Sequence, residues 1–165
     1  MSNNDAFMTL EDARRWFKAE AIANGRMTTC PCCDRRTKAY RRPLNLTMLR
    51  SLSWLHKESQ GSRWVDLSSA APRYVVATNQ LPTVRWWGLA ERNDADAKKA
   101  DLRNAGLWRT TQRAALWLSG QIKVPKYIIT YADEFIVFDG EAIGPRDIDA
   151  HFSFSEIMQP LTGAA

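Results

Sequence analysis

Apolar side chains recur at steps of three and four residues in two stretches of the chain, and this spacing predicts two amphipathic helices. The first is expected over residues 9–25, with a threonine N-cap and a glycine at its end. The second is expected over residues 46–57, where leucines form a stripe wide enough to be buried. Asp66 then caps a short helix, residues 67–71, which ends before Pro72.

A third helical segment is predicted over residues 79–89, with Asn79 as its N-cap and Pro82 in its first turn, where a proline is tolerated. The chain leaves it after Gly88 as a strand over residues 89–92. A second strand, residues 107–110, is expected to pair with the first across a polar loop. Another helix follows and ends at residue 119.

In the rest of the chain, the pattern of side chains is typical of strands. Residues 126–131 and 134–138 are rich in β-branched and aromatic side chains, and the pattern predicts a hairpin joined by residues 132–133. Asp139 and Gly140 are expected to make the next turn. Ser153 with Glu156 has the spacing of a capping box, which predicts a last short helix.

This order of elements predicts an α+β fold built around a winged helix-turn-helix core. We expect residues 1–43 to form an N-terminal helix and a Cys/Arg-rich segment, and residues 44–120 to form the core. Residues 121–165 are expected to add a β-hairpin and a short helix that pack on that core.

Composition narrows the class of protein. The chain has 165 residues, 45% of them hydrophobic, and a net charge of +5, which favours an anionic partner such as nucleic acid. It has no apolar run long enough for a membrane span, and its first residues do not have the pattern of a secretory signal. We therefore expect a cytoplasmic protein without a membrane partner.

All three cysteines lie between Cys30 and Cys33, an odd, clustered set that fits a reducing compartment rather than a disulfide framework. Cys30 and Cys33 have the C-x-x-C spacing that lets two thiolates reach one zinc ion. A closed zinc site needs two more ligands, from Cys32, Asp34, His56 or a partner chain. The alternative is a turn with free thiols.

Two segments resemble a known family. TVRWWGLAE followed by NAGLWRTTQRAALWLSG is similar to the pattern of MarR-like winged-helix proteins. The chain also resembles a class of small proteins encoded by bacteriophages, which carry a CPxC-type cluster, KxYxR, a winged helix, VPK and a hairpin. The matching pieces are Cys30-Pro31-Cys32-Cys33, Lys38-Ala39-Tyr40-Arg41-Arg42 and Val124-Pro125-Lys126.

The resemblance covers most of residues 9–161 and implies architecture rather than a firm activity. It places Val84, Trp87 and Leu89 in the core and makes residues 89–110 the wing. It also implies a homodimer, since MarR-like proteins usually dimerise, and the cytoplasm of a host cell as the location. The long wing loop and Pro82 depart from the MarR-like plan.

Catalytic motifs are not evident in the sequence, and we expect no enzymatic activity. The two histidines, His56 and His151, have no nucleophile at a suggestive spacing. Several acids lie near the predicted hairpin turns, where such residues usually serve the turn; the alternative is a metal-dependent nuclease site. These acids are Asp133, Glu134, Asp139 and Glu141.

Nucleic-acid binding is the sharper hypothesis, because a winged helix docks its third helix in the major groove and its wing on the backbone. The candidate residues on the third helix are Asn79, Gln80, Thr83 and Arg85. Those on the wing are Arg92, Lys98 and Lys99. A basic strip before the core adds Arg35, Arg36, Lys38, Tyr40, Arg41 and Arg42, whose cations suit phosphates and whose tyrosine suits base stacking.

Each of these surfaces also has an interpretation that does not involve nucleic acid. Acids on the wing nearly cancel its cations, Trp86 and Pro82 suit a protein contact, and the basic strip is also typical of solvated surface. Two functions therefore remain. The first is a phage-type protein that binds double-stranded DNA, as a regulator or an accessory factor. The second is a non-enzymatic protein that binds and modulates a host protein through the winged-helix scaffold.

Overall fold

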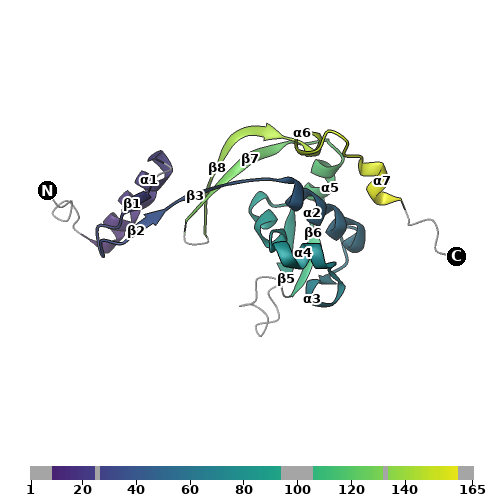
Figure 1. Cartoon of the computed structure of the whole chain (residues 1–165), viewed down its shortest axis with the longest axis horizontal. Coiled ribbons are helices and arrows are strands. Elements are labelled where there is room, and N and C mark those ends of the chain that lie inside the picture. Colours follow the sequence, from purple (N-terminus) through teal and green to yellow (C-terminus); the bar gives the residue numbers. More distant parts are fainter. Residues whose placement is uncertain (1–8, 25–26, 94–105, 132–133, 160–165) are drawn as a thin grey trace. The chain divides into compact units, whose positions relative to one another are not determined.

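The computed structural model describes residues 9–24, 27–93, 106–131 and 134–159. The chain forms a mixed α+β structure that divides into two compact units. Unit 1 comprises residues 1–43 and 126–140, and unit 2 comprises residues 44–125 and 141–165 (Figure 1). Residues 121–165, expected to pack as one piece on the core, are thus shared between the units.

Unit 1 begins with α1 (Leu10–Asn24), as predicted. The Thr9 hydroxyl accepts a hydrogen bond from the Asp12 backbone N–H at 3.1 Å, which caps the helix. Ala13 and Phe17 are buried, and the Phe17 ring lies 5.0 Å from the Tyr131 ring. The α1 helix lies beside a hairpin of β1 (Met27–Thr29) and β2 (Arg36–Lys38) (Figure 1).

The main sheet of unit 1 has the strand order β3-β7-β8. β3 (Tyr40–Pro43) pairs antiparallel with β7 (Val124–Tyr131), and β8 (Glu134–Ile143) lies on the other side of β7. This long-range pairing brings the Cys/Arg-rich segment into one unit with the C-terminal hairpin. The predicted strands are confirmed and extended, and residues 132–133 lie outside the described residues.

The turn predicted at Asp139 and Gly140 is wrong, because β8 continues through both residues. Gly140 has a φ of 81°, and a Cβ there would lie 2.7 Å from Cδ2 of Tyr127. The glycine therefore permits a local change of backbone direction inside the strand, and the tyrosine ring packs against it.

Unit 2 contains a second three-stranded sheet, in the order β4-β6-β5. Its strands are β4 (Val65–Asp66), β5 (Ala90–Asn93) and β6 (Leu107–Thr110), and the predicted pairing of the last two is confirmed. α2 (Leu46–Ser59) packs along β6 (Figure 1). Its N-cap is Asn45, whose Oδ1 accepts the Met48 N–H at 3.0 Å.

Short helices complete unit 2. α3 (Leu67–Ala70) is capped by Asp66, and α5 (Gln112–Leu118) is capped by Thr111, both as predicted. α6 (Pro145–Ile148) and α7 (Phe154–Met158) follow the second hairpin. The capping box expected at Ser153 is not formed, because its hydroxyl bonds with that of Ser155 at 3.0 Å.

The third helical segment differs from the prediction. α4 (Arg73–Thr78), which the sequence did not reveal, begins after Pro72. Asn79 has a φ of 50° and ends α4, so it is a C-cap and not an N-cap. A 3-10 helix, η2 (Leu81–Trp87), follows and ends at Gly88. The left-handed Asn79 marks the break between the two helices, and Pro82 stands in the first turn of η2, where its missing N–H removes no helical hydrogen bond.

The core of unit 2 centres on three tryptophans, Trp87, Trp108 and Trp117, each no more than 1% exposed. Trp87 Nε1 donates to the Pro125 carbonyl at 2.6 Å, and Trp117 Nε1 donates to the Ile143 carbonyl at 2.9 Å. Each of these two indole N–H groups thus has a partner, as burial requires. None of the described helices is long and apolar enough to cross a membrane.

Candidate nucleic-acid interface

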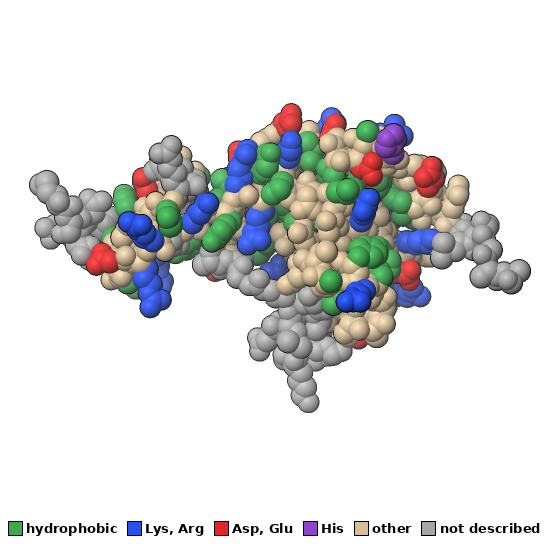
Figure 2. Space-filling model, viewed as in Figure 1, with side chains coloured by type: hydrophobic (Ala, Val, Ile, Leu, Met, Phe, Trp, Pro, Cys, Tyr) green, Lys and Arg blue, Asp and Glu red, His purple; other side chains and the backbone are tan. Residues whose placement is uncertain are grey.

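β3 is an edge strand whose four residues are all exposed. Its register with β7 pairs Tyr40 with Thr130 and Arg41 with Ile129. Because side chains alternate along a strand, Tyr40 and Arg42 share one face of the sheet and Arg41 lies on the other. Figure 2 shows Lys and Arg side chains over this part of unit 1.

The first face carries a tyrosine between two cations. Tyr40 is 54% exposed, Lys38 Nζ lies 5.9 Å from the centre of its ring, and the Arg42 guanidinium lies 5.7 Å from it. Arg42 Nε donates a hydrogen bond to the Thr130 hydroxyl at 3.1 Å, which fixes the direction of the arginine. This face therefore offers two positive charges beside an accessible aromatic ring.

The opposite face is more nearly neutral. The Arg41 guanidinium stacks on the Tyr127 ring at 3.6 Å and bonds to the Asp139 carboxylate. The hydrogen bond from Arg41 holds the pKa of Asp139 below its usual value, and the Gly140 N–H adds to this effect. Arg41, although predicted as a phosphate ligand, is therefore already committed to an internal carboxylate.

The remaining cations of the strip are Arg35 and Arg36, both exposed at the start of β2. Arg36 pairs with Thr29 across the hairpin. No Asp or Glu occurs in the sequence between Arg35 and Lys57. The structure thus brings Arg36, Lys38, Tyr40 and Arg42 of the basic strip onto consecutive strands of one unit, while Arg41 of the same strip is bonded to Asp139.

The residues predicted on the third helix do not form one helical surface. Gln80 Oε1 accepts a hydrogen bond from Asn45 Nδ2 at 2.8 Å, so its amide is engaged within unit 2. Thr83 is half-buried, and the Arg85 guanidinium lies over the Trp86 ring at 4.6 Å. Of the residues predicted on a wing, Arg92 is half-buried, while Lys98 and Lys99 lie outside the described residues.

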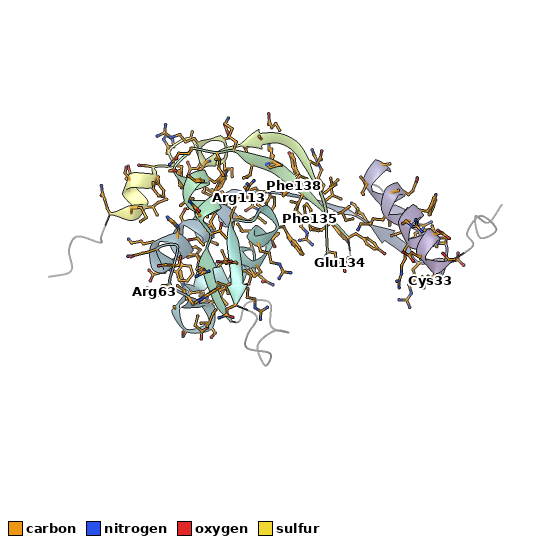
Figure 3. All side chains as sticks on the ribbon, turned by 180° about the vertical axis from the view of Figure 1, so that it is seen from behind. Cys33, Arg63, Arg113, Glu134, Phe135 and Phe138 are labelled. Carbon is orange, nitrogen blue, oxygen red and sulfur yellow. The ribbon has the colours of Figure 1, made fainter. Side chains whose placement is uncertain are left out.

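The cysteines occupy the turn between β1 and β2 (Figure 3). The Cys30 N–H donates to the Arg35 carbonyl and the Asp34 N–H donates to the Cys30 carbonyl, both at 2.9 Å. Backbone hydrogen bonds from Cys32 and Cys33 lower the pKa of the Cys30 thiol, more than partial burial raises it. Cys32 and Cys33 are exposed.

His56, a candidate to complete a zinc site, is a core residue of unit 2. Its Nδ1 lies 2.9 Å from the Thr110 hydroxyl, and burial lowers its pKa. Within the described part of the chain, no three His, Cys, Asp or Glu side chains are grouped so as to hold a metal ion. Of the acids near the second hairpin, Asp139 is bound by Arg41, and Asp133 is not among the described residues.

Unit 2 has an apolar groove of about 610 Å³ that sequence reasoning missed. It lies between α2, α4 and α7, and its apolar lining includes Leu46, Trp54, Tyr74, Phe152 and Ile157. Leu46 is 37% exposed and Tyr74 46% exposed. The sequence contained no local sign of α4, so the groove between these helices had no visible signal.

The chain matches no family model, no curated protein and no solved structure in comparisons with known proteins. The geometry of the two units is therefore the basis for a functional assignment.

Proposed function

We propose that this protein binds DNA, without a catalytic step, and that the basic strip of unit 1 makes its phosphate contacts. The observation that carries the proposal is the exposed edge of β3, where Tyr40 lies between Lys38 and Arg42. Phosphate contacts supply most of the sequence-independent affinity of DNA-binding proteins, and the exposed cations Lys38 and Arg42 suit such contacts. Double-stranded DNA is the expected ligand.

In this proposal unit 2 is a winged-helix-like scaffold. The order α2, β4, three short helical segments, β5 and β6, with the sheet order β4-β6-β5, supports that interpretation. The segment in the place of the recognition helix is divided into α4 and η2, and Gln80 is turned toward Asn45. We therefore assign the main contacts to the basic strip and expect little base readout from residues 79–85.

The test is the salt dependence of binding to a labelled DNA duplex, measured by fluorescence anisotropy. Replacing Lys38 and Arg42 together by Ala removes two phosphate contacts, so the slope of log affinity against log salt should become shallower by about 1.8. Affinity at low salt should fall for all duplex sequences alike. A single-stranded DNA of the same sequence shows whether stacking on Tyr40 favours unpaired bases.

A matched control removes the same charge elsewhere. Arg63→Ala with Lys123→Ala changes two exposed cations of unit 2, which are paired with Glu58 and Asp147. This variant should keep the wild-type slope. If both double variants lose affinity equally, only net charge matters and the assignment to the basic strip is wrong.

The groove of unit 2 favours a second candidate function, the binding of a host protein. Its apolar lining and exposed Leu46 and Tyr74 would suit an apolar peptide segment laid between α2 and α4. A single host protein recovered with the wild-type chain, and lost with Tyr74→Ser while the DNA slope is unchanged, would support it. Equal recovery by both chains would count against this groove.

A further inference from the structure

The turn that holds the cysteines is closed by its own backbone. The Cys30 N–H donates to the Arg35 carbonyl and the Asp34 N–H donates to the Cys30 carbonyl, both at 2.9 Å. Asp34 adopts a φ of 55°, the left-handed conformation that closes the turn. These contacts hold Cys30 and Cys33 within one tight turn.

The side chains of this turn provide only part of a metal site. Cys30 and Cys33 are three residues apart, the spacing at which two thiolates reach one tetrahedral zinc ion. A closed site needs four ligands, and no third ligand is grouped with the cysteines in a metal-binding cluster within the described ranges. His56 is bonded to Thr110 in the core of unit 2.

A second copy of the chain can supply the two missing ligands. Cys33 is exposed in the turn of a hairpin (Figure 3), so its thiol is accessible to a second copy of the chain. We propose that Cys30 and Cys33 of two copies of this chain together bind one zinc ion, which joins the copies through a tetrathiolate site. Oligomers with two-fold symmetry are the commonest kind, and this site has that symmetry.

Charge is consistent with this arrangement. Four thiolates around one zinc ion carry a net charge of −2, which must be balanced when two turns meet. Arg35 and Arg36 follow directly after the turn, and both are exposed. In the joined pair, the arginines of both copies surround the negative site, so their mutual repulsion is offset there.

The experiment titrates zinc into metal-free, reduced protein and follows mass by light scattering and metal content by elemental analysis. The expected result is saturation at about one zinc ion per two chains, with doubling of the 18.8 kDa mass. A chelator should restore the single chain. Cobalt in place of zinc should give the absorption of a tetrahedral thiolate site at the same ratio.

Two substitutions separate the ligands from their neighbour. Cys33→Ser should abolish zinc-dependent doubling, whereas Cys32→Ser, the matched control, should keep it. Amide hydrogen exchange in α1 and β7 of unit 1 reports whether each variant is folded. Mixing two differently tagged wild-type chains should give a mixed pair that forms with zinc and separates with chelator.

One zinc ion per chain at a constant mass would overturn the proposal, since it would place all ligands in one chain. So would a pair that persists in Cys33→Ser under chelation, or no zinc uptake by the folded wild-type chain. The proposal is independent of the DNA-binding function, because the contribution of Lys38 and Arg42 to the salt slope is measured on the chelated chain as well. The zinc proposal can therefore fail while the DNA-binding proposal holds, and the reverse.

Discussion

The core of unit 2 and the sheet of unit 1 differ in the exposure of their large aromatic side chains. In unit 2, Trp87, Trp108 and Trp117 are fully buried. In unit 1, Tyr40 is 54% exposed and Phe138 40% exposed, and the Phe138 ring lies tilted against that of Phe135 on β8, with ring centres 4.8 Å apart (Figure 3). An exposed aromatic among cations is typical of a binding surface, whereas a closed tryptophan core is typical of a scaffold.

This contrast suggests a division of roles, in which unit 2 supplies stability and unit 1 supplies contacts. In unit 2, the buried side chains of Ser59 and His56 both lie within hydrogen-bond distance of the Thr110 hydroxyl. In unit 1, all four residues of β3 are exposed. Substitutions in the two units should therefore have different consequences, and the following predictions test that separation.

The largest expected effect is on the stability of unit 2. Trp117→Ala removes a fully buried ring and leaves the Ile143 carbonyl without its indole donor, so unfolding should become easier by about 3–5 kcal/mol. Chemical denaturation followed by tryptophan fluorescence measures it. A loss below about 1 kcal/mol would show that this ring is not part of a closed core.

A smaller effect is expected for the sheet of unit 1. Gly140→Val puts a branched side chain at a positive φ and against the Tyr127 ring, so the strand should be destabilised by about 1–3 kcal/mol. Amide hydrogen exchange should increase in β7 and β8 and remain unchanged in α2. Equal loss of protection in α2 would mean that the two units unfold together.

The pH dependence of unit 2 should reflect His56. Burial lowers its pKa in the folded state, so the unfolded chain binds the proton more tightly. Stability should therefore be constant above the unfolded value of about 6.5 and decrease as the pH falls from there toward the folded pKa. His56→Gln, which cannot titrate, should flatten this part of the profile of denaturation midpoint against pH.

Much of the fold was predictable, because α1, α2, α5 and the strands of the β5-β6 and β7-β8 hairpins carry their signals locally. Asn79 was misassigned because an asparagine serves both as an N-cap and, in the left-handed conformation, as a C-cap. The basic strip was visible as a run of charge. The pairing of β3 with β7 could not be predicted, because partners far apart in the chain leave no local pattern. This pairing decides which cations share a face of the sheet.

In the sheet that this pairing forms, Arg41 lies beside Asp139. This contact allows a test of which charged surface attracts DNA, with the smallest effect of those predicted. If the basic strip binds phosphates, Asp139→Asn frees the Arg41 guanidinium and removes a negative charge from the same sheet. Arg41 lies on the face opposite Tyr40 and Arg42 and adds no phosphate contact there, so the salt slope should stay unchanged while DNA affinity at low salt rises by roughly threefold through the lost negative charge. Glu58→Gln, the matched control, releases Arg63 in unit 2 and should change neither value. A gain in both variants would mean that the charge of the whole chain attracts DNA, whereas a gain confined to Asp139→Asn would identify the sheet of unit 1 as the surface that DNA touches.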